Sequence, residues 1–499
     1  MTDEHLARAL HGAGLLSRES LTNAARLRHA GETLAHALVR LEFIAPGEIM
    51  RFMPQAFDEE AAPASNGDAN GHAEAISPPV APEVGLAERD NTDFNGVFTV
   101  EGADGAADPS QAPVVHFTNE LLRLAITMGA SDIHLEPRSD GLLPRYRIDG
   151  QLRPGQLLPS DLTLPMVSRM KVIGGLDITE NRMPQDGRFR ATLGKRTFDF
   201  RVSSLPSIHG EKIVLRLLDH TSLVTDLTRL GFAEDDKRDF ESMLGRSHGM
   251  ILVTGPTGSG KTTTLYAALA GTRDDTKNVI TVEDPVEYEL EGVTQTNVHS
   301  DIGLNFASVL RSILRQDPDV ILVGEIRDPE TADVAVRAAL TGHLLLSTLH
   351  TNSAVAAITR LQDMDVPSYL IASSLVGVIA QRLARLNCRF CRAPIPQNDP
   401  ARLEYGAALD LSPDSPMFKG AGCEKCGGTG SRGRMALLEL LHIDSRLRRA
   451  IMDKQDSDTL RSIARQSGFK TLVDDARGKV TAGHISPEEA MRVIVGHEE

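Results

Sequence analysis

The chain has 499 residues and a net charge of −15, and 41% of its residues are hydrophobic but only 4% aromatic. A chain of this length should hold several domains, and its negative charge argues against nucleic acid as a partner. It has no run of 18 apolar residues and does not begin with a charged and then apolar signal segment. We therefore expect a soluble, cytoplasmic protein.

The first 112 residues divide into two parts of different composition. Residues 1–56 are expected to be helical and carry a weak repeat with an offset of 28 residues. Residues 57–112 contain twelve acidic residues but a single basic one, Arg89, and are rich in alanine, proline, glycine and asparagine. This composition predicts an acidic, flexible linker. The repeat pairs Leu6 with Leu34, Leu10 with Leu38, Leu15 with Phe43, Leu16 with Ile44 and Leu21 with Ile49.

Residues 113–222 should form a second folded unit that mixes helices and strands. Its first part, Glu120 to Met128, has the pattern of a helix, and Arg145 to Gly150 predicts a strand that enters a turn. Arginines on the strands of this unit, taken alone, fit a surface role.

The most specific motif lies in the third unit, residues 223–386. It follows a strand-like run, Met250 to Val253, and precedes a helix-like segment, Thr263 to Leu269, which is the setting that a GxxxxGK[ST] phosphate loop requires. Glycines let backbone N–H groups point at phosphate oxygens, the lysine reaches the β- and γ-phosphates, and the next hydroxyl ligates Mg²⁺. The sequence therefore predicts a site for ATP and Mg²⁺ in Gly255, Pro256, Thr257, Gly258, Ser259, Gly260, Lys261, Thr262 and Thr263.

A carboxylate downstream should complete this site. The apolar run Val320 to Val323 predicts a buried parallel strand, and Glu325 follows at its carboxyl end. Strands of open α/β sheets end at the ligand crevice. We therefore expect Glu325 to face the Mg²⁺ and the γ-phosphate, with Thr262 as the other protein ligand of the metal.

Further polar residues follow or flank two other predicted strands. Glu283, Asp284 and Glu287 come after a strand-like run, and one of them could orient the attacking water while the others hold metal or are solvated. The residues alone do not rank these acids. His343 and His350 flank an apolar segment, which suggests a strand with a polar residue at each end. Histidines satisfied in a core or on the surface are the alternative.

All four cysteines lie in two CxxC pairs, 31 residues apart, within the segment 387–434. Each pair offers two thiolates from one tight turn, and two pairs form a tetrahedral cage suited to structural Zn²⁺. Two disulfides are the alternative, which a reducing cytosol disfavours. Residues 435–499 are predicted to form a small helical domain, and its last helix opens with a capping box at Ser486. The predicted zinc ligands are Cys388, Cys391, Cys423 and Cys426.

The order of these motifs resembles that in the ATPases of type II secretion and type IV pilus assembly. Besides the phosphate loop and the acids, the resemblance rests on Thr341 to Thr351 and on the cysteine pattern Gly422 to Arg434, and it is strongest from Gly129 to Arg434. It implies an α/β multidomain fold. A RecA-like P-loop motor would be preceded by a PAS-like α/β domain and a small helical N-terminal module. An inserted tetracysteine zinc element and a helical C-terminal domain would follow.

The same resemblance implies roles for individual residues. It places His343 and His350 near the γ-phosphate, and it aligns Arg201 and Arg216 with arginines that move onto the phosphates. Arg188 is a weaker candidate for this role. A guanidinium there would neutralise charge that develops on the γ-phosphoryl oxygens. Together with the acids described above, these residues form the expected catalytic set.

The resemblance further implies a cytoplasmic homohexamer, peripheral on the inner membrane, that couples Mg-ATP hydrolysis to pseudopilus assembly and protein export. Its partners would be the cytoplasmic domain of an inner-membrane secretion protein, a polytopic platform protein and acidic lipid. Nucleic acid is not expected. Cyclic di-GMP is not expected either, because the repeat in residues 1–56 lacks the arginine and glycine of relatives that bind it.

Other functions remain as alternatives. A type IV pilus-extension ATPase is the nearest one, whereas the tetracysteine element disfavours a pilus-retraction ATPase. Ser431 stands where type II secretion ATPases commonly have tyrosine. A DNA translocase would need a basic groove. A module that senses nucleotide without turnover would not need the acids and histidines.

Overall fold

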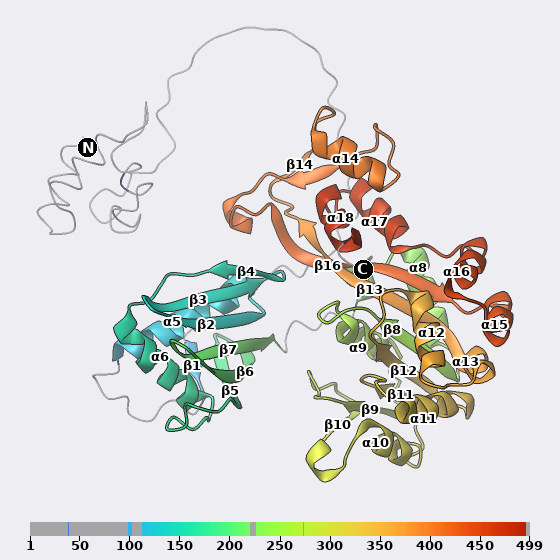
Figure 1. The fold of residues 1–499 in the computed structure, drawn as a ribbon, viewed down its shortest axis with the longest axis horizontal. Helices are drawn as coiled ribbons and strands as arrows, with labels where there is room; N and C mark the ends of the chain where they lie inside the picture. The colour runs from blue at the N-terminus through green and yellow to red at the C-terminus, as the bar shows by residue number, and fades with distance from the viewer. Residues whose placement is uncertain (1–37, 39–97, 102–111, 220–225, 273, 496–499) are drawn as a thin grey trace, which may run out of the picture. The chain divides into compact units, whose positions relative to one another are not determined.

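The computed structural model describes residues 38, 98–101, 112–219, 226–272 and 274–495. The chain divides into two compact units, Met1–Pro79 and Val80–Glu499, and every described residue except Leu38 belongs to the second. Apart from Leu38, the predicted N-terminal module, residues 1–56, therefore lies outside the described residues, as does most of the predicted linker, residues 57–112 (Figure 1).

The first folded part of the second unit is a seven-stranded antiparallel sheet with helices α5 and α6, which pack against each other and the sheet (Figure 1). Alternate side chains of its strands form the core, as Phe198, Phe200 and Val202 do on β6. The helix and strand predicted in this part are confirmed by α5 and β3. The strand order is β1-β5-β6-β7-β2-β3-β4. The elements are β1 Phe98–Val100, α5 Ala112–Met128, β2 Asp132–Arg138, β3 Gly141–Ile148, β4 Gln151–Pro154, α6 Ser160–Ile173, β5 Gln185–Leu193, β6 Arg196–Ser207 and β7 Gly210–Asp219.

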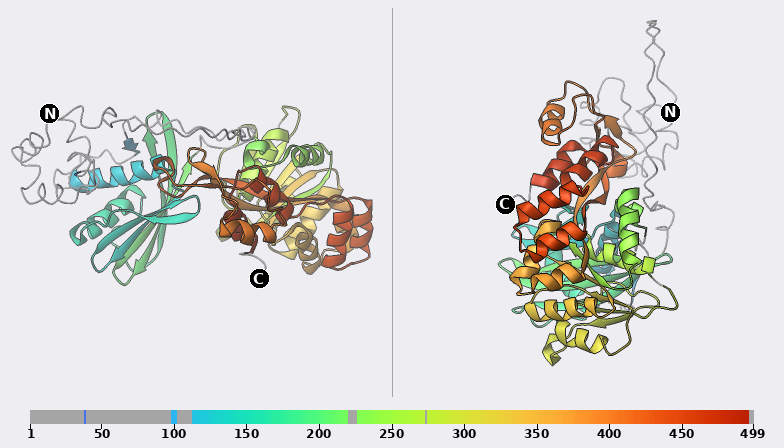
Figure 2. Two further views of the ribbon diagram at one scale, coloured as in Figure 1. Left: turned by 90° about the horizontal axis from the view of Figure 1, so that it is seen from above. Right: turned by 90° about the vertical axis from the view of Figure 1, so that its right-hand side faces the viewer.

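The second folded part is built on a sheet in the order β10-β9-β11-β12-β8-β13-β16, parallel except for β16, which runs antiparallel to β13. Met250 and Leu252 of β8 join the core with α10–α13, whereas Ile251 and Val253 join the core with α8 and α9. Figure 2 shows the helices of these two layers on opposite sides of the sheet. A strand covered on both faces is apolar throughout, which explains why the sequence predicts it.

The elements of this sheet follow one another in α/β order. They are α7 Leu227–Leu230, α8 Glu234–Leu244, β8 Gly249–Thr254, α9 Lys261–Thr272, β9 Val279–Glu283, β10 Thr294–Asn297, η4 Ser300–Ile302, α10 Phe306–Ile313, β11 Val320–Val323, α11 Pro329–Leu340, β12 Leu344–Leu349, α12 Ala354–Asp363, α13 Ser368–Ser374 and β13 Leu375–Asn387.

An insertion separates β13 from its neighbour β16 and holds both cysteine pairs. Four helices follow β16, and the last of them confirms the predicted final helix after Ser486. These elements are β14 Arg392–Pro394, α14 Pro400–Ala408, β15 Phe418–Gly420, η5 Glu424–Cys426, β16 Ser431–His442, α15 Ser445–Met452, α16 Ser457–Gln466, α17 Leu472–Thr481 and α18 Pro487–Val495.

Two segments differ from the sequence-based prediction. Phe98–Val100 falls in the predicted linker, but it forms β1 and pairs with β5, where Val100 is buried. Residues 435–442 fall in the predicted helical domain, but they belong to β16, which completes the motor sheet beside β13. Both predictions failed because these short segments become strands by pairing with a distant strand. Local composition gives no information on such pairing.

Within the described ranges, no helix combines the length and apolar character that a membrane crossing needs.

A buried ion pair fixes α17 against β16. Lys479 Nζ lies 2.5 Å from Asp475 Oδ2 and donates to the carbonyl of Ala436 at 2.7 Å. The same carboxylate oxygen accepts from the backbone N–H of Leu438 at 2.8 Å. Burial lowers the pKa of Lys479 and raises the pKa of Asp475, while each charge opposes the shift of the other. The two charges therefore depend on each other.

We expect Lys479→Met to lower the free energy of unfolding by about 3–5 kcal/mol, because it leaves the Asp475 carboxylate buried without its partner. The double variant Asp475→Asn/Lys479→Met should lose less, since no charge is then left buried alone. Urea unfolding followed by circular dichroism measures both losses. A double variant that is as unstable as Lys479→Met would contradict this account.

Candidate active site

The loop between β8 and α9, residues 255–260, can be built only with glycines at several positions. Gly255, Gly258 and Gly260 have φ angles of 143°, 78° and 88°, which side-chain-bearing residues rarely adopt. A Cβ on Gly255 would lie 2.3 Å from the backbone oxygen of Gln381, while one on Gly258 would meet no atom within 4 Å. The loop is thus pressed against β13 at its start and open near its middle. With the N-terminus of α9 behind it, this geometry fits a phosphate group.

Lys261 begins α9 and reaches back over the loop. Its Nζ donates to the carbonyls of Gly255 and Pro256 at 2.8 Å and 3.0 Å. Burial lowers the pKa of Lys261, and the negative charge of Glu325 opposes this shift. Ser259 Oγ is buried and has no hydrogen-bond partner among the described residues. The cradle therefore offers a cation and an unused hydroxyl to a phosphate oxygen, and Thr262 next to Lys261 is exposed.

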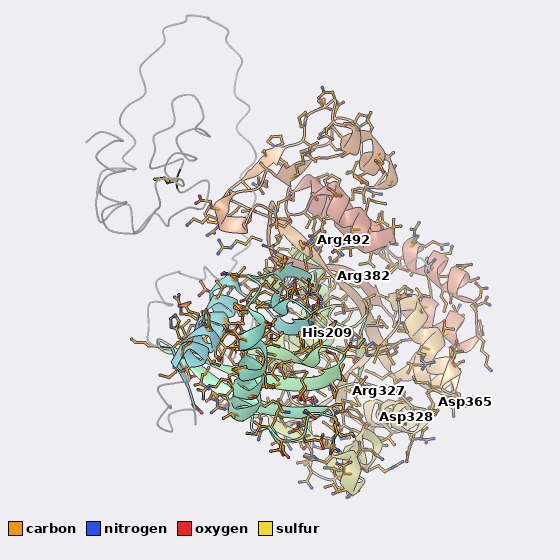
Figure 3. All side chains as sticks on the ribbon, turned by 60° about the vertical axis from the view of Figure 1, so that its left-hand side comes forward. His209, Arg327, Asp328, Asp365, Arg382 and Arg492 are labelled. Carbon is orange, nitrogen blue, oxygen red and sulfur yellow. The ribbon has the colours of Figure 1, made fainter. Side chains whose placement is uncertain are left out.

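Glu325 lies two residues beyond β11, at the carboxyl edge of the sheet. One carboxylate oxygen is 2.5 Å from Arg327 Nη2, and the other is 3.5 Å from His350 Nε2. Arg327 is labelled in Figure 3 beside Asp328, the N-cap of α11. Burial lowers the pKa of His350, as do the charges of Lys261 and Arg327, while Glu325 raises it. A largely neutral His350 at neutral pH can accept or donate a hydrogen bond.

Glu283 is buried at the end of β9, and its carboxylate is already bound by three side chains. One oxygen accepts from the hydroxyl of Tyr266 at 2.5 Å. The other accepts from Thr281 Oγ1 at 2.6 Å and from Gln295 Nε2 at 3.1 Å. Burial and the charge of Glu283 raise the pKa of Tyr266, which keeps the hydroxyl protonated as a donor. Glu283 thus ties α9 to β9 and β10, and its remaining capacity to orient water is small.

The predicted arginines lie side by side on the first sheet. Arg188 of β5 is opposite Arg201 of β6, Arg201 is opposite Arg216 of β7, and Arg216 is opposite Asp132 of β2. Directly opposite residues share a face, so the three arginines form one row. Asp132 Oδ1 accepts from Arg216 Nε at 3.1 Å. Arg201 Nη2 lies 2.9 Å from the carboxylate of Glu287.

The two histidines are not brought together. His350 follows β12 and His343 precedes it, so the length of the strand, about 20 Å, separates them. The ring of His343 lies 2.9 Å from the carbonyl of Ala338, and its own carbonyl accepts from the N–H of Gly249, at the start of β8. His343 is therefore at the amino edge of the sheet, away from the phosphate loop. The expectation that it lies near the γ-phosphate in this site is wrong, because the direction of β12 decides which end faces the loop.

The four cysteines form one cluster in the insertion. They are free thiols, and their sulfurs lie within 4.8 Å of one another, with separations of 3.8 Å, 3.9 Å and 3.7 Å for three pairs. Four sulfurs about 2.3 Å from a tetrahedral Zn²⁺ would be about 3.8 Å apart. The backbone N–H groups of Cys423 and Gly430 donate to Cys426 Sγ, both at 3.2 Å. The donor set and its spacing fit zinc.

Sequence reasoning missed several residues around the loop. Arg327 contacts Glu325 but has no motif of its own. Tyr266 and Gln295 hold Glu283 from separate elements, which a linear pattern does not reveal. The sequence could have indicated Gln381, because this polar residue directly follows a continuous apolar run, Leu375 to Ala380, in β13.

Comparisons with known proteins identify relatives of this chain. The profile of a family described as type II/IV secretion system protein matches residues 107–492. The chain is 50% identical over 392 residues to type II secretion system protein E of Dickeya dadantii, covering 78% of this chain and 77% of the relative. It is 44% identical over 375 residues to the type IV pilus assembly ATPase PilB of Thermus thermophilus, covering 75% of this chain and 42% of the relative. The solved pilus retraction motor PilT with bound ADP is similar with a TM-score of 0.52 and 30% identity, covering 75% of this chain and 95% of that one.

The two candidate acids should respond differently to loss of charge. We expect Glu325→Gln to lower kcat for ATP hydrolysis at least about 100-fold with little change in thermal stability, because its carboxylate is at the loop but holds no core elements together. Glu283→Gln should lower the melting temperature by several degrees, since the NH2 group that replaces one carboxylate oxygen cannot accept the buried hydrogen bonds made to that oxygen. Steady-state hydrolysis and thermal unfolding of both variants measure the difference. A large loss of kcat in Glu283→Gln together with a loss of stability in Glu325→Gln would mean that Glu283 is the catalytic acid and Glu325 the structural one.

Proposed function

Because the chain belongs to the type II/IV secretion system protein family and is an ATPase, we propose that it is the motor of a type II secretion system. In this proposal it works as a cytoplasmic homohexamer that couples Mg-ATP hydrolysis to pseudopilus assembly and protein export. The observation that carries the proposal is the grouping of Lys261, Glu325 and His350 around one phosphate loop. Identity over more than three quarters of both chains to a type II secretion protein supports the choice of machine.

The residues suggest a division of work within the site. Loop N–H groups, Lys261 and Ser259 would bind the β- and γ-phosphates, with Lys261 leaving the loop carbonyls that it now bonds to. Glu325 would accept a hydrogen bond from the attacking water and orient it, and His350 would hold the Glu325 carboxylate in place. Thr262 and Glu325 would hold Mg²⁺, which supplies charge stabilisation at the phosphates.

Arginines from the row on the first sheet would complete the site. Arg201 and Arg216 now pair with carboxylates, Glu287 and Asp132 respectively, and would have to leave these partners to reach the phosphates. Phosphate oxygens would compete with these carboxylates for the arginines. Charge that grows on the γ-phosphoryl group would then be neutralised only when the arginines reach it.

The tetracysteine cluster would hold a structural Zn²⁺, because four thiolates leave no open position for a substrate. We expect about one zinc per chain in protein purified without chelator, and Cys423→Ser to lower this content and destabilise the insertion. Mass spectrometry of bound metal and thermal unfolding measure both. The loop glycines lie outside the insertion, so Mg-ADP affinity should be retained. Full thermal stability in a zinc-free chain would overturn the assignment.

The partners belong to the same proposal. The N-terminal module would dock on the cytoplasmic domain of an inner-membrane secretion protein, and the motor would act on a polytopic platform protein and contact acidic lipid. Neither nucleic acid nor cyclic di-GMP is proposed as a ligand. A type IV pilus-extension motor is the second candidate, favoured by the 44% identity to PilB.

The proposal is tested by Mg²⁺-dependent ATP hydrolysis across a size-exclusion profile of the full chain. We expect activity in the hexameric fraction, raised by the cytoplasmic domain of the inner-membrane partner together with acidic lipid vesicles. Lys261→Ala should abolish this activity, because it removes the cation that binds the phosphates. Stimulation of hydrolysis by DNA but not by the partner would contradict the assignment to a type II secretion system. Wild-type hydrolysis by Lys261→Ala would mean that the site is wrong.

A further inference from the structure

Strand β13 passes directly behind the phosphate loop, and one of its side chains bonds to that loop. Gln381 is 2% exposed. Its Nε2 donates to the carbonyl of Ser259 at 2.8 Å, and its Oε1 accepts from Thr264 Oγ1 at 2.7 Å. A single buried amide therefore joins the loop to α9, on either side of Lys261.

The same residue also limits the path of the loop at its two ends. A Cβ on Gly255 would lie 2.3 Å from the backbone oxygen of Gln381, and a Cβ on Gly260 would lie 2.7 Å from its Nε2. The loop is thus in close contact with Gln381 at its beginning and at its end. Both hydrogen-bonding groups of the amide are used, so the contact has a defined orientation as well as a defined distance.

The next residue on β13 acts on the other half of the site. Arg382 Nη2 donates to the carbonyl of Asn352 at 3.0 Å, in the segment that follows His350, and Arg382 is labelled in Figure 3. Successive strand residues point to opposite faces, so β13 contacts the loop with one side chain and the His350 segment with the next. This strand is thus placed to hold the residues that would contact phosphate in the proposed function, although it contributes none of them.

We propose that Gln381 is a positioning residue of the ATP site, which holds residues 259–264 in the conformation that binds phosphate. With the amide in place, the backbone that carries Ser259 and Lys261 is held before nucleotide arrives. Without it, nucleotide binding must also order the loop, and affinity falls. The inference rests on the ATP site of the proposed function and not on the secretion machine in which the motor works.

The test uses the full chain and the variant Gln381→Met, which keeps the length of the side chain but removes both hydrogen bonds. We expect the Kd for Mg-ADP, measured by calorimetry, and the KM for Mg-ATP to rise about tenfold. Such a rise corresponds to part of the free energy that two ordinary hydrogen bonds contribute. The kcat should change less than about threefold, because the amide contacts no reacting atom. A variant with wild-type Kd and KM would overturn the proposal.

Ile379→Val is the matched control. Ile379 lies two residues earlier on the same strand and faces the same core, is fully buried, and makes no hydrogen bond to the loop through its side chain. It should lower the melting temperature to a similar extent as Gln381→Met while its Kd and KM stay at the wild-type values. If both variants weaken nucleotide binding equally, the effect of Gln381 is general destabilisation and the proposal fails.

Thr264→Val provides a second variant should Gln381→Met not fold. It removes only the hydroxyl that donates to Gln381 Oε1, and we expect a rise in Kd of about threefold; no rise would count against the proposal.

Lys261→Ala separates failure of the proposed ATP site from failure of the proposed role of Gln381. If Lys261→Ala binds Mg-ADP like the wild type, the ATP site itself is misplaced and the inference falls with it. If Lys261→Ala fails to bind but Gln381→Met binds normally, only the positioning role is lost.

Discussion

Burial of β8 on both faces fixes where the phosphate loop begins, and the parallel register of its neighbours brings the remaining residues to the same edge. Thr254, the last residue of β8, pairs with Leu349, the last residue of β12, so that Gly255 and His350 continue from adjacent strand ends. Thr254 Oγ1 strengthens this junction through contacts with the carbonyls of Leu349 and Thr351. Strand length and register therefore determine the geometry of the site. Its polar residues lie together because they follow the ends of buried apolar strands.

The parts of the site that sequence reveals are those that depend on consecutive residues. The phosphate loop needs glycines at set positions next to Lys261, and each CxxC pair needs a tight turn. Short sequence motifs are therefore sufficient to predict the geometry of both. The position of Glu325 after an apolar run follows from the same kind of reasoning. In each case the structure of the segment is decided by residues within about ten positions of it.

The parts that sequence does not reveal depend on pairing between distant segments. His343 and His350 look equivalent as a pattern, but only the direction of β12 shows that one lies at each edge of the sheet. Glu283 looks like a free acid until Tyr266 and Gln295 are seen to bind it. Residues 435–442 are apolar enough for either a helix or a strand, and the free edge of β13 decides in favour of a strand. Three-dimensional neighbours decide each of these cases.

The tetracysteine insertion leaves the motor sheet after β13 ends at Asn387 and returns to it where β16 begins at Ser431. These two strands are hydrogen-bonded neighbours, so the insertion is a long closed loop whose ends must meet before the last strand of the sheet can pair. Until then β13 presents an open strand edge, which is the kind of surface that invites pairing between chains. A cluster that draws the ends of the insertion together would shorten the time for which a newly made chain exposes this edge.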